Sequence, residues 1–129
     1  MAAVNPRTLT RLDGEYAICR LAANAPIPDW YRDSTFWSVT RTPNELSVVC
    51  SAARVPKGIQ SEAPWHCFAV DGPIPFDETG VIASLSEPLR KAAVGIFVVS
   101  TYDTDYILVR AANVERAITA WRAAGHTVR

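Results

Sequence analysis

The sequence predicts an α+β fold in which antiparallel strands pack against helices. Three observations lead to this class. Several short segments are rich in β-branched and aromatic residues, two longer segments carry apolar residues at helical spacing, and a strand-turn-strand pattern occurs twice in the 129 residues. Because 49% of the residues are hydrophobic and 20% are charged, the chain has the composition of a globular protein.

Six segments have the residue types of β-strands. They are Tyr16–Leu21, Phe36–Arg41, Leu46–Cys50, Trp65–Val70, Ile96–Ser100 and Tyr106–Arg110. Turn residues separate the second strand from the third (Pro43, Asn44) and the fifth from the sixth (Asp103 to Asp105). Both spacings suit tight antiparallel hairpins. Residues 1–15 show no sustained pattern, and we expect them to form a short arm that holds little core.

The first helical segment is Gly80–Ala93, whose apolar residues recur at three- and four-residue steps. Thr79 is the expected N-cap, and Gly95 lies beyond the expected end. Pro88 interrupts this pattern. It removes one backbone hydrogen bond, so it either bends the helix or marks a later start.

The second helical segment begins after Asn113, the expected N-cap, and ends before Gly125. Its apolar stripe includes Trp121. Residues His126 to Val128 are expected to add a short last strand.

An internal repeat indicates two related units. A shift of 60 residues places Phe36–Val49 on Ile96–Val109, with Thr40 on Ser100. A shift of 49 residues places the strand YAICRL on WHCFAV. Each half then has one strand followed by a hairpin, and in the second half the connections are long enough for helices. We therefore expect a reduced N-terminal unit with its arm (residues 1–61) and a complete C-terminal unit (residues 62–129).

Charge and apolar patterning exclude several classes of function. Thirteen basic residues balance thirteen acidic ones without a basic run, so nucleic acid is not an expected partner. The longest apolar run, 92–99, is far shorter than the roughly 20 residues of a membrane span, which predicts a cytoplasmic protein. Cys19, Cys50 and Cys67 lack metal-binding spacing, so we expect buried, reduced thiols and no cofactor.

The stretch GVIASLSEPLRKAAVGIFVVSTYDTDYILV resembles the C-terminal half of small bacterial proteins with two ACT domains. The resemblance extends to YAICRLAANAPIPDW, FWSVTRTPNELSVVC and WHCFAVDG, and STYDTDYILV is its most specific part. ACT domains are ferredoxin-like βαββαβ modules that typically bind amino acids and regulate metabolic enzymes, including aspartate kinases, and similar modules occur in animal cytosolic arginine sensors. The resemblance implies tandem ACT units, the first reduced, and a non-catalytic regulatory role.

The resemblance also implies where a ligand binds, at the loop before the first helix and at the second hairpin. The residues support both places, because the first N–H groups of a helix favour a carboxylate and an acidic side chain favours a ligand cation. Turn geometry alone also accounts for several of these residue types, above all Asp103. The candidate ligand-binding residues are Glu78, Thr79, Gly80, Val81, Ile82, Thr101, Asp103 and Asp105.

Two functions remain open at this point. The first is an amino-acid sensor, for which two candidate acids favour lysine or arginine, acting as a homodimer on an unknown downstream protein. The second is a protein-interaction module without a small ligand. An enzyme is not expected, because His66 and Cys67 are adjacent strand residues that point to opposite faces and cannot form a nucleophile-base pair.

Overall fold

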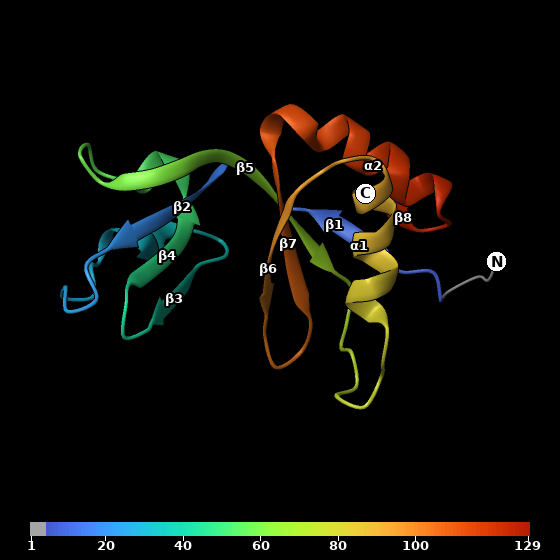
Figure 1. The fold of residues 1–129 in the computed structure, drawn as a ribbon, viewed down its shortest axis with the longest axis horizontal. Helices are drawn as coiled ribbons and strands as arrows, with labels where there is room; N and C mark the ends of the chain where they lie inside the picture. The colour runs from blue at the N-terminus through green and yellow to red at the C-terminus, as the bar shows by residue number, and fades with distance from the viewer. Residues whose placement is uncertain (1–4) are drawn as a thin grey trace. The chain divides into compact units, whose positions relative to one another are not determined.

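The computed structural model describes residues 5–129, which form eight strands, two α-helices and three short 3₁₀ helices (Figure 1). In chain order these are β1 (Thr8–Arg11), β2 (Tyr16–Leu21), η1 (Trp30–Asp33), β3 (Ser38–Arg41), β4 (Leu46–Ser51), η2 (Ala52–Arg54), β5 (Gln60–Val70), α1 (Val81–Lys91), β6 (Ile96–Ser100), β7 (Asp105–Arg110), η3 (Ala111–Asn113), α2 (Val114–Ala123) and β8 (Thr127–Val128). The predicted α+β class is confirmed. Neither α-helix in the described chain is long and apolar enough to cross a membrane.

The chain forms two compact units. The larger unit combines the residues up to Leu12 with His66–Arg129, and the smaller unit is Asp13–Trp65. Strand β5 begins in the smaller unit and ends in the larger one. This division differs from a single boundary after residue 61, because the N-terminal strand belongs with the C-terminal part of the chain.

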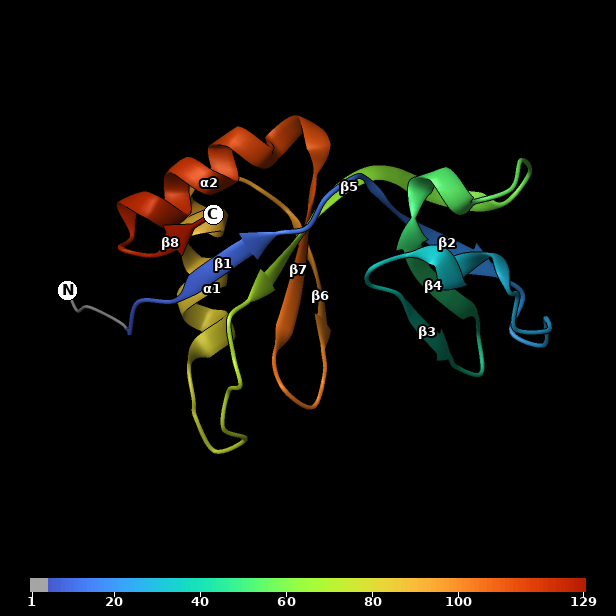
Figure 2. The same ribbon diagram turned by 180° about the vertical axis from the view of Figure 1, so that it is seen from behind.

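The larger unit contains one sheet with the strand order β6-β7-β5-β1-β8. Strand β1 is antiparallel to β5 and parallel to β8, with Leu9 opposite both Val70 and Val128. Helices α1 and α2 pack against each other and against this sheet (Figures 1 and 2). The shared core contains buried side chains from β1, β5, α1, β7, α2 and β8, among them Phe68, Leu85 and Trp121.

The expectation that residues 1–15 hold little core is wrong. Leu9 is completely buried in the core of the larger unit. Two backbone hydrogen bonds tie β1 to the C-terminus, from Arg11 N–H to the Arg129 carbonyl (2.8 Å) and from Arg129 N–H to the Leu9 carbonyl (2.9 Å). A four-residue strand was too short to stand out by its pattern, and its partners are distant in sequence.

Helix α1 differs from the prediction at both ends. Its N-cap is Gly80 in the left-handed region (φ 80°), one residue after the expected Thr79. At the other end Ala93, and not Gly95, adopts a positive φ of 58°. The reason is the buried Val94, whose N–H donates to the Leu89 carbonyl (2.8 Å) in a Schellman-type ending. Pro88 lies inside the helix.

Helix α2 follows the prediction more closely. Asn113 occupies the N-cap position, and Gly125 follows the helix with a φ of 100°. The His126 N–H donates to the Trp121 carbonyl (3.0 Å), which completes the same type of ending. The short last strand is also present as β8.

The smaller unit is a set of antiparallel strands in the order β3-β4-β2, with the first half of β5 beside β2. One cluster of its core contains Ala17, Cys19, Tyr31, Val48 and Cys50. All three cysteines are free and buried, as predicted.

Candidate ligand cleft

A cleft of about 320 Å³ lies between the loop that precedes α1 and the turn that joins β6 to β7, all within the larger unit. We call it the loop–hairpin cleft. Its lining residues are Ile74, Pro75, Phe76, Glu78, Gly80, Val81, Ile82, Ser100, Thr101, Tyr102, Thr104 and Asp105. This volume falls at the small end of the range for small-molecule sites.

Six of the eight candidate ligand-binding residues line this cleft. They are Glu78, Gly80, Val81, Ile82, Thr101 and Asp105. Thr79 lines a neighbouring side pocket instead. Asp103 lines neither cavity. Its backbone carbonyl accepts a hydrogen bond from the Ile74 N–H (2.7 Å), so it acts as a structural turn residue.

The wall of the cleft depends on close contact between loop and hairpin. A Cβ atom on Gly72 would lie 3.0 Å from the Asp103 carbonyl oxygen, which explains the glycine. The Thr104 hydroxyl donates to the Val70 carbonyl (2.5 Å) at the end of β5. Sequence reasoning missed Gly72 and Thr104. The dipeptide Gly72-Pro73 indicates a tight turn, but it does not indicate which segment the turn contacts.

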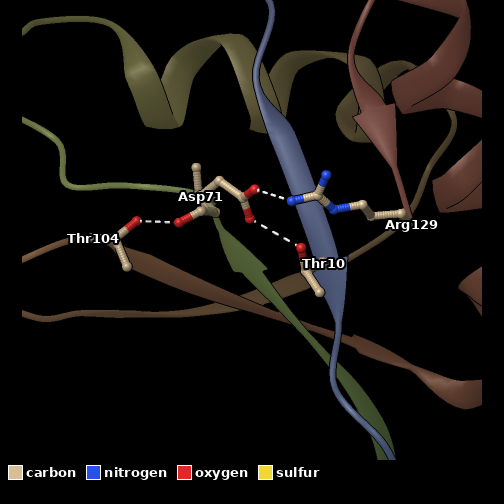
Figure 3. Close-up of polar contacts among 5 residues, drawn as sticks. Thr10, Asp71, Thr104 and Arg129 are labelled. Atoms are coloured by element: carbon tan, nitrogen blue, oxygen red, sulfur yellow. Dashed lines mark hydrogen bonds and ion pairs between the residues drawn. The ribbon is translucent and has the colours of Figure 1, made fainter.

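Asp71, the first residue of this loop, contacts strand β1 and Arg129 (Figure 3). Its carboxylate accepts hydrogen bonds from the Thr10 hydroxyl (2.9 Å) and from Arg129 Nη2 (2.6 Å). Its backbone N–H donates to the Thr8 carbonyl (2.8 Å). The loop therefore leaves the sheet from a position set by β1 and by the C-terminal residue.

The start of α1 lies at the cleft. Gly80 and Val81 line it, and the first N–H groups of a helix have no partner within the helix. The Ser84 N–H already donates to the Gly80 carbonyl (2.9 Å), so the first turn is well formed. Together with the helix dipole, such groups favour a negatively charged ligand atom.

Acidic side chains supply the opposite charge. Asp105 accepts a hydrogen bond from the Ser100 hydroxyl (2.5 Å), and Glu78 forms an ion pair with Arg7. The Glu78 and Arg7 side chains are only 25% and 15% exposed, so this pair is partly shielded from solvent.

Two exposed aromatic side chains are among the lining residues of the cleft. Phe76 comes from the loop and Tyr102 from the hairpin turn, and they are 75% and 80% exposed. Their ring centroids are 4.9 Å apart in an edge-to-face arrangement.

The structure agrees with the argument against a Cys-His nucleophile. The His66 ring contacts Arg11 Nη2 (3.2 Å), whereas Cys67 is completely buried. Burial raises the pKa of the Cys67 thiol to about 12, so this sulfur is protonated at neutral pH.

Similarity to known proteins covers almost the whole chain. An ACT-domain family model matches residues 60–122, and a second family model, described as an N-terminal domain, matches residues 14–58. A crystal structure of a protein from Agrobacterium tumefaciens has a TM-score of 0.92 at 42% identity, covering 98% of this chain and 94% of that one.

Two more distant structures share the fold. A Vibrio cholerae protein of unknown function has a TM-score of 0.75 at 18% identity and covers 92% of this chain and 89% of its own. The ligand-free regulatory subunit of aspartate kinase from Thermus thermophilus has a TM-score of 0.58 at 10% identity, covering 87% of this chain and 93% of its own. The matched domain model and the ferredoxin-like arrangement of the larger unit lead to one conclusion: the chain belongs to the ACT-domain superfamily.

Proposed function

We propose that this chain is a non-catalytic regulatory protein that binds a free amino acid in the loop–hairpin cleft. The observation that supports this most directly is the meeting of two opposite features in one cavity, the N-terminus of α1 and the carboxylate of Asp105. An α-amino acid carries a carboxylate and an ammonium group on the same carbon atom, so its site needs both features side by side.

The proposed roles follow from charge. The backbone N–H groups at Gly80 and Val81 receive the ligand carboxylate, as helix N-termini do for anions. Glu78 and Asp105 receive cationic groups of the ligand. Thr101 contributes a hydroxyl at the hairpin turn, and Ile82 an apolar wall.

Lysine or arginine is the favoured ligand. The cleft and the side pocket together are lined by one cationic side chain, Arg7, and two carboxylates, those of Glu78 and Asp105. An amino acid with a cationic side chain therefore balances the charge. Phe76 and Tyr102 add aromatic faces to which an ammonium or guanidinium group is attracted.

The experiment is a thermal-shift screen of the purified protein against the twenty amino acids. At 100 times its dissociation constant a ligand adds about 2.7 kcal/mol to stability, which raises Tm by several degrees. We expect one amino acid to do so, and Asp105→Ala to abolish the shift.

The matched control is Asp103→Ala. Asp103 is an exposed aspartate two residues away in the same hairpin and lies outside the cleft. It should keep the full shift. An equal loss in both variants would mean that the hairpin, and not the Asp105 carboxylate, is what matters, and an absence of any shift in the unmodified protein would sink the proposal.

The proposed regulation acts through a second copy of the chain or through another protein. We expect a homodimer, because β6 pairs with β7 along one edge only, and a second chain can cover the other edge. Sedimentation at micromolar concentration should give twice the monomer mass of 14.1 kDa. A monomer that persists with and without amino acid would contradict this.

The alternative is a protein-interaction module without a small ligand. The exposure of Phe76 and Tyr102 favours it, since adjacent exposed aromatic rings are typical of binding surfaces. Under this alternative, no amino acid raises Tm in the thermal-shift screen. Phe76→Ala instead weakens the association with the partner protein.

A further inference from the structure

The side pocket adjoins the loop–hairpin cleft. It has a volume of about 280 Å³ and includes Asn5, Arg7, Thr79 and Ser84 among its lining residues. Glu78, Gly80 and Val81 line both cavities, so one short segment forms their common wall. A ligand that extends across this segment would occupy both cavities.

Arg7 is the basic side chain of the side pocket, and its backbone is held firmly on both sides. Its N–H donates to His126 Nδ1 (3.0 Å), and its carbonyl accepts a hydrogen bond from the Thr127 N–H (2.9 Å). His126 is itself buried, with 4% exposure. The arginine therefore leaves a rigid part of the unit, immediately before β1.

Glu78 contacts only some of the N–H donors of the Arg7 guanidinium. The ion pair joins Nη2 of Arg7 to Oε2 of Glu78. A guanidinium has five N–H donors and binds carboxylates through pairs of them. The remaining donors are available to a second carboxylate that enters the side pocket. Because the Arg7 side chain is only 15% exposed, a charge-assisted hydrogen bond there is weakened less by solvent than one at the surface.

We propose that Arg7 is a ligand-binding residue: its guanidinium shares the α-carboxylate of the bound amino acid with the backbone N–H groups of Gly80 and Val81, which line both cavities, while the ligand's side chain occupies the loop–hairpin cleft. This inference rests on the proposed function and extends it to a residue outside the ACT-like loop and hairpin. The ligand's α-ammonium then lies near Glu78, which keeps its contact with Arg7. The ligand would also connect the segment before β1 to the loop before α1.

The test compares amino acids with their carboxamides by isothermal titration calorimetry on the full chain. The probes are the twenty common L-amino acids and the matching L-amino acid amides, which keep the ammonium and side chain but lack the carboxylate charge. The unmodified protein should bind one acid at least about tenfold more tightly than its amide, as expected for a charge-assisted contact. In Arg7→Gln this ratio should fall several-fold, because only the backbone N–H groups at Gly80 and Val81 then remain to receive the carboxylate.

The control is Arg90→Gln. Arg90 forms an exposed ion pair with Glu87 on α1, and the substitution removes its guanidinium. It should keep the full ratio. A purely structural role for Arg7 would weaken acid and amide equally and leave the ratio unchanged, which would overturn the inference while amino-acid binding stands. No binding of any probe to the unmodified protein would overturn the proposed function itself.

Arg7→Lys guards against a variant that fails to fold. It keeps a positive charge opposite Glu78 but loses the paired donors of the guanidinium. An acid-to-amide affinity ratio between that of the unmodified protein and that of Arg7→Gln supports a guanidinium-carboxylate contact. A ratio equal to that of the unmodified protein counts against it.

Discussion

The hairpin of the smaller unit (β3–β4) and that of the larger unit (β6–β7) are built on the same turn but carry different chemistry. Arg41 pairs with Leu46 across four turn residues, and Ser100 pairs with Asp105 across another four. In each turn the first residue is a threonine, Thr42 or Thr101. Its N–H donates to the carbonyl of the fourth residue (2.9 and 2.7 Å), and its hydroxyl accepts the N–H of that residue (3.1 and 3.2 Å).

The residues that flank the turn show where the two hairpins diverge. Leu46 is completely buried, whereas Asp105 at the equivalent position lines the cleft. Arg41 donates to the carbonyls of Ala23 and Ala25 in the preceding connection, whereas Ser100 donates to Asp105. The backbone frame is thus common to both units, and one position beside the turn decides whether it supports a core or a polar site.

The chain after each hairpin shows why only one unit has a second helix. Both hairpins continue into a 3₁₀ turn, Ala52–Arg54 or Ala111–Asn113. Val114 then has helical angles (φ −59°, ψ −45°) and begins α2, whereas Val55 is extended (φ −76°, ψ 122°). Pro56 follows Val55, and a proline disfavours helical geometry in the residue before it.

Exchanging the residues at the two equivalent positions beside the turn tests whether the hairpins differ in kind. Leu46→Asp should destabilise the smaller unit by at least about 3 kcal/mol, because it removes buried apolar volume and buries an unpaired charge. Asp105→Leu should change stability by less than about 1 kcal/mol, since the aspartate is partly exposed and loses one hydroxyl contact. Urea unfolding measures both.

Amino-acid binding provides the second readout of this exchange. Asp105→Leu should abolish the ligand-induced thermal shift while the protein remains folded. If Asp105→Leu unfolded the protein as severely as Leu46→Asp, the aspartate would be a structural residue and the two positions would not differ in kind.

Much of this comparison was visible in the sequence. The hairpins, both helices and the short last strand were predicted, and most of the proposed site follows from the loop and turn residues around Glu78 and Asp105. The predicted alignment of the repeat is wrong by one residue. A shift of 60 matched Thr40 to Ser100, whereas the turns coincide at a shift of 59, with Thr42 on Thr101. Apolar residues match at either shift, and only the hydrogen bonds of the turn distinguish them.

What the sequence did not show depends on contacts between distant segments. Strand β1 is too short to carry a pattern, and its pairing with β5 and β8 spans most of the chain. The same holds for Arg7, whose role beside Glu78 exists only once that strand is in place. Gly72 was likewise unremarked, because its need for close approach arises from a turn about 30 residues later.

Helix α1, which the smaller unit lacks, contains a proline that should weaken it. Pro88 has no N–H to donate to the carbonyl four residues before, that of Ser84. In the structure the Ser84 carbonyl contacts His126 Nε2 (3.2 Å), while His126 Nδ1 accepts the Arg7 N–H. These two partners assign the proton to Nε2. The histidine therefore supplies the donor that the proline withholds.

A double-mutant cycle isolates that contact. His126→Ala should cost about 1–3 kcal/mol in the original background, because it leaves the Ser84 carbonyl and the Arg7 N–H, both partly buried, without these partners. In Pro88→Ala the new backbone N–H can bond to Ser84, so the same substitution should cost about 1 kcal/mol less. Urea unfolding of the four proteins gives this difference. An equal cost in both backgrounds would show that the proline and the histidine are independent, and that the helix of the larger unit is stabilised by its apolar face alone.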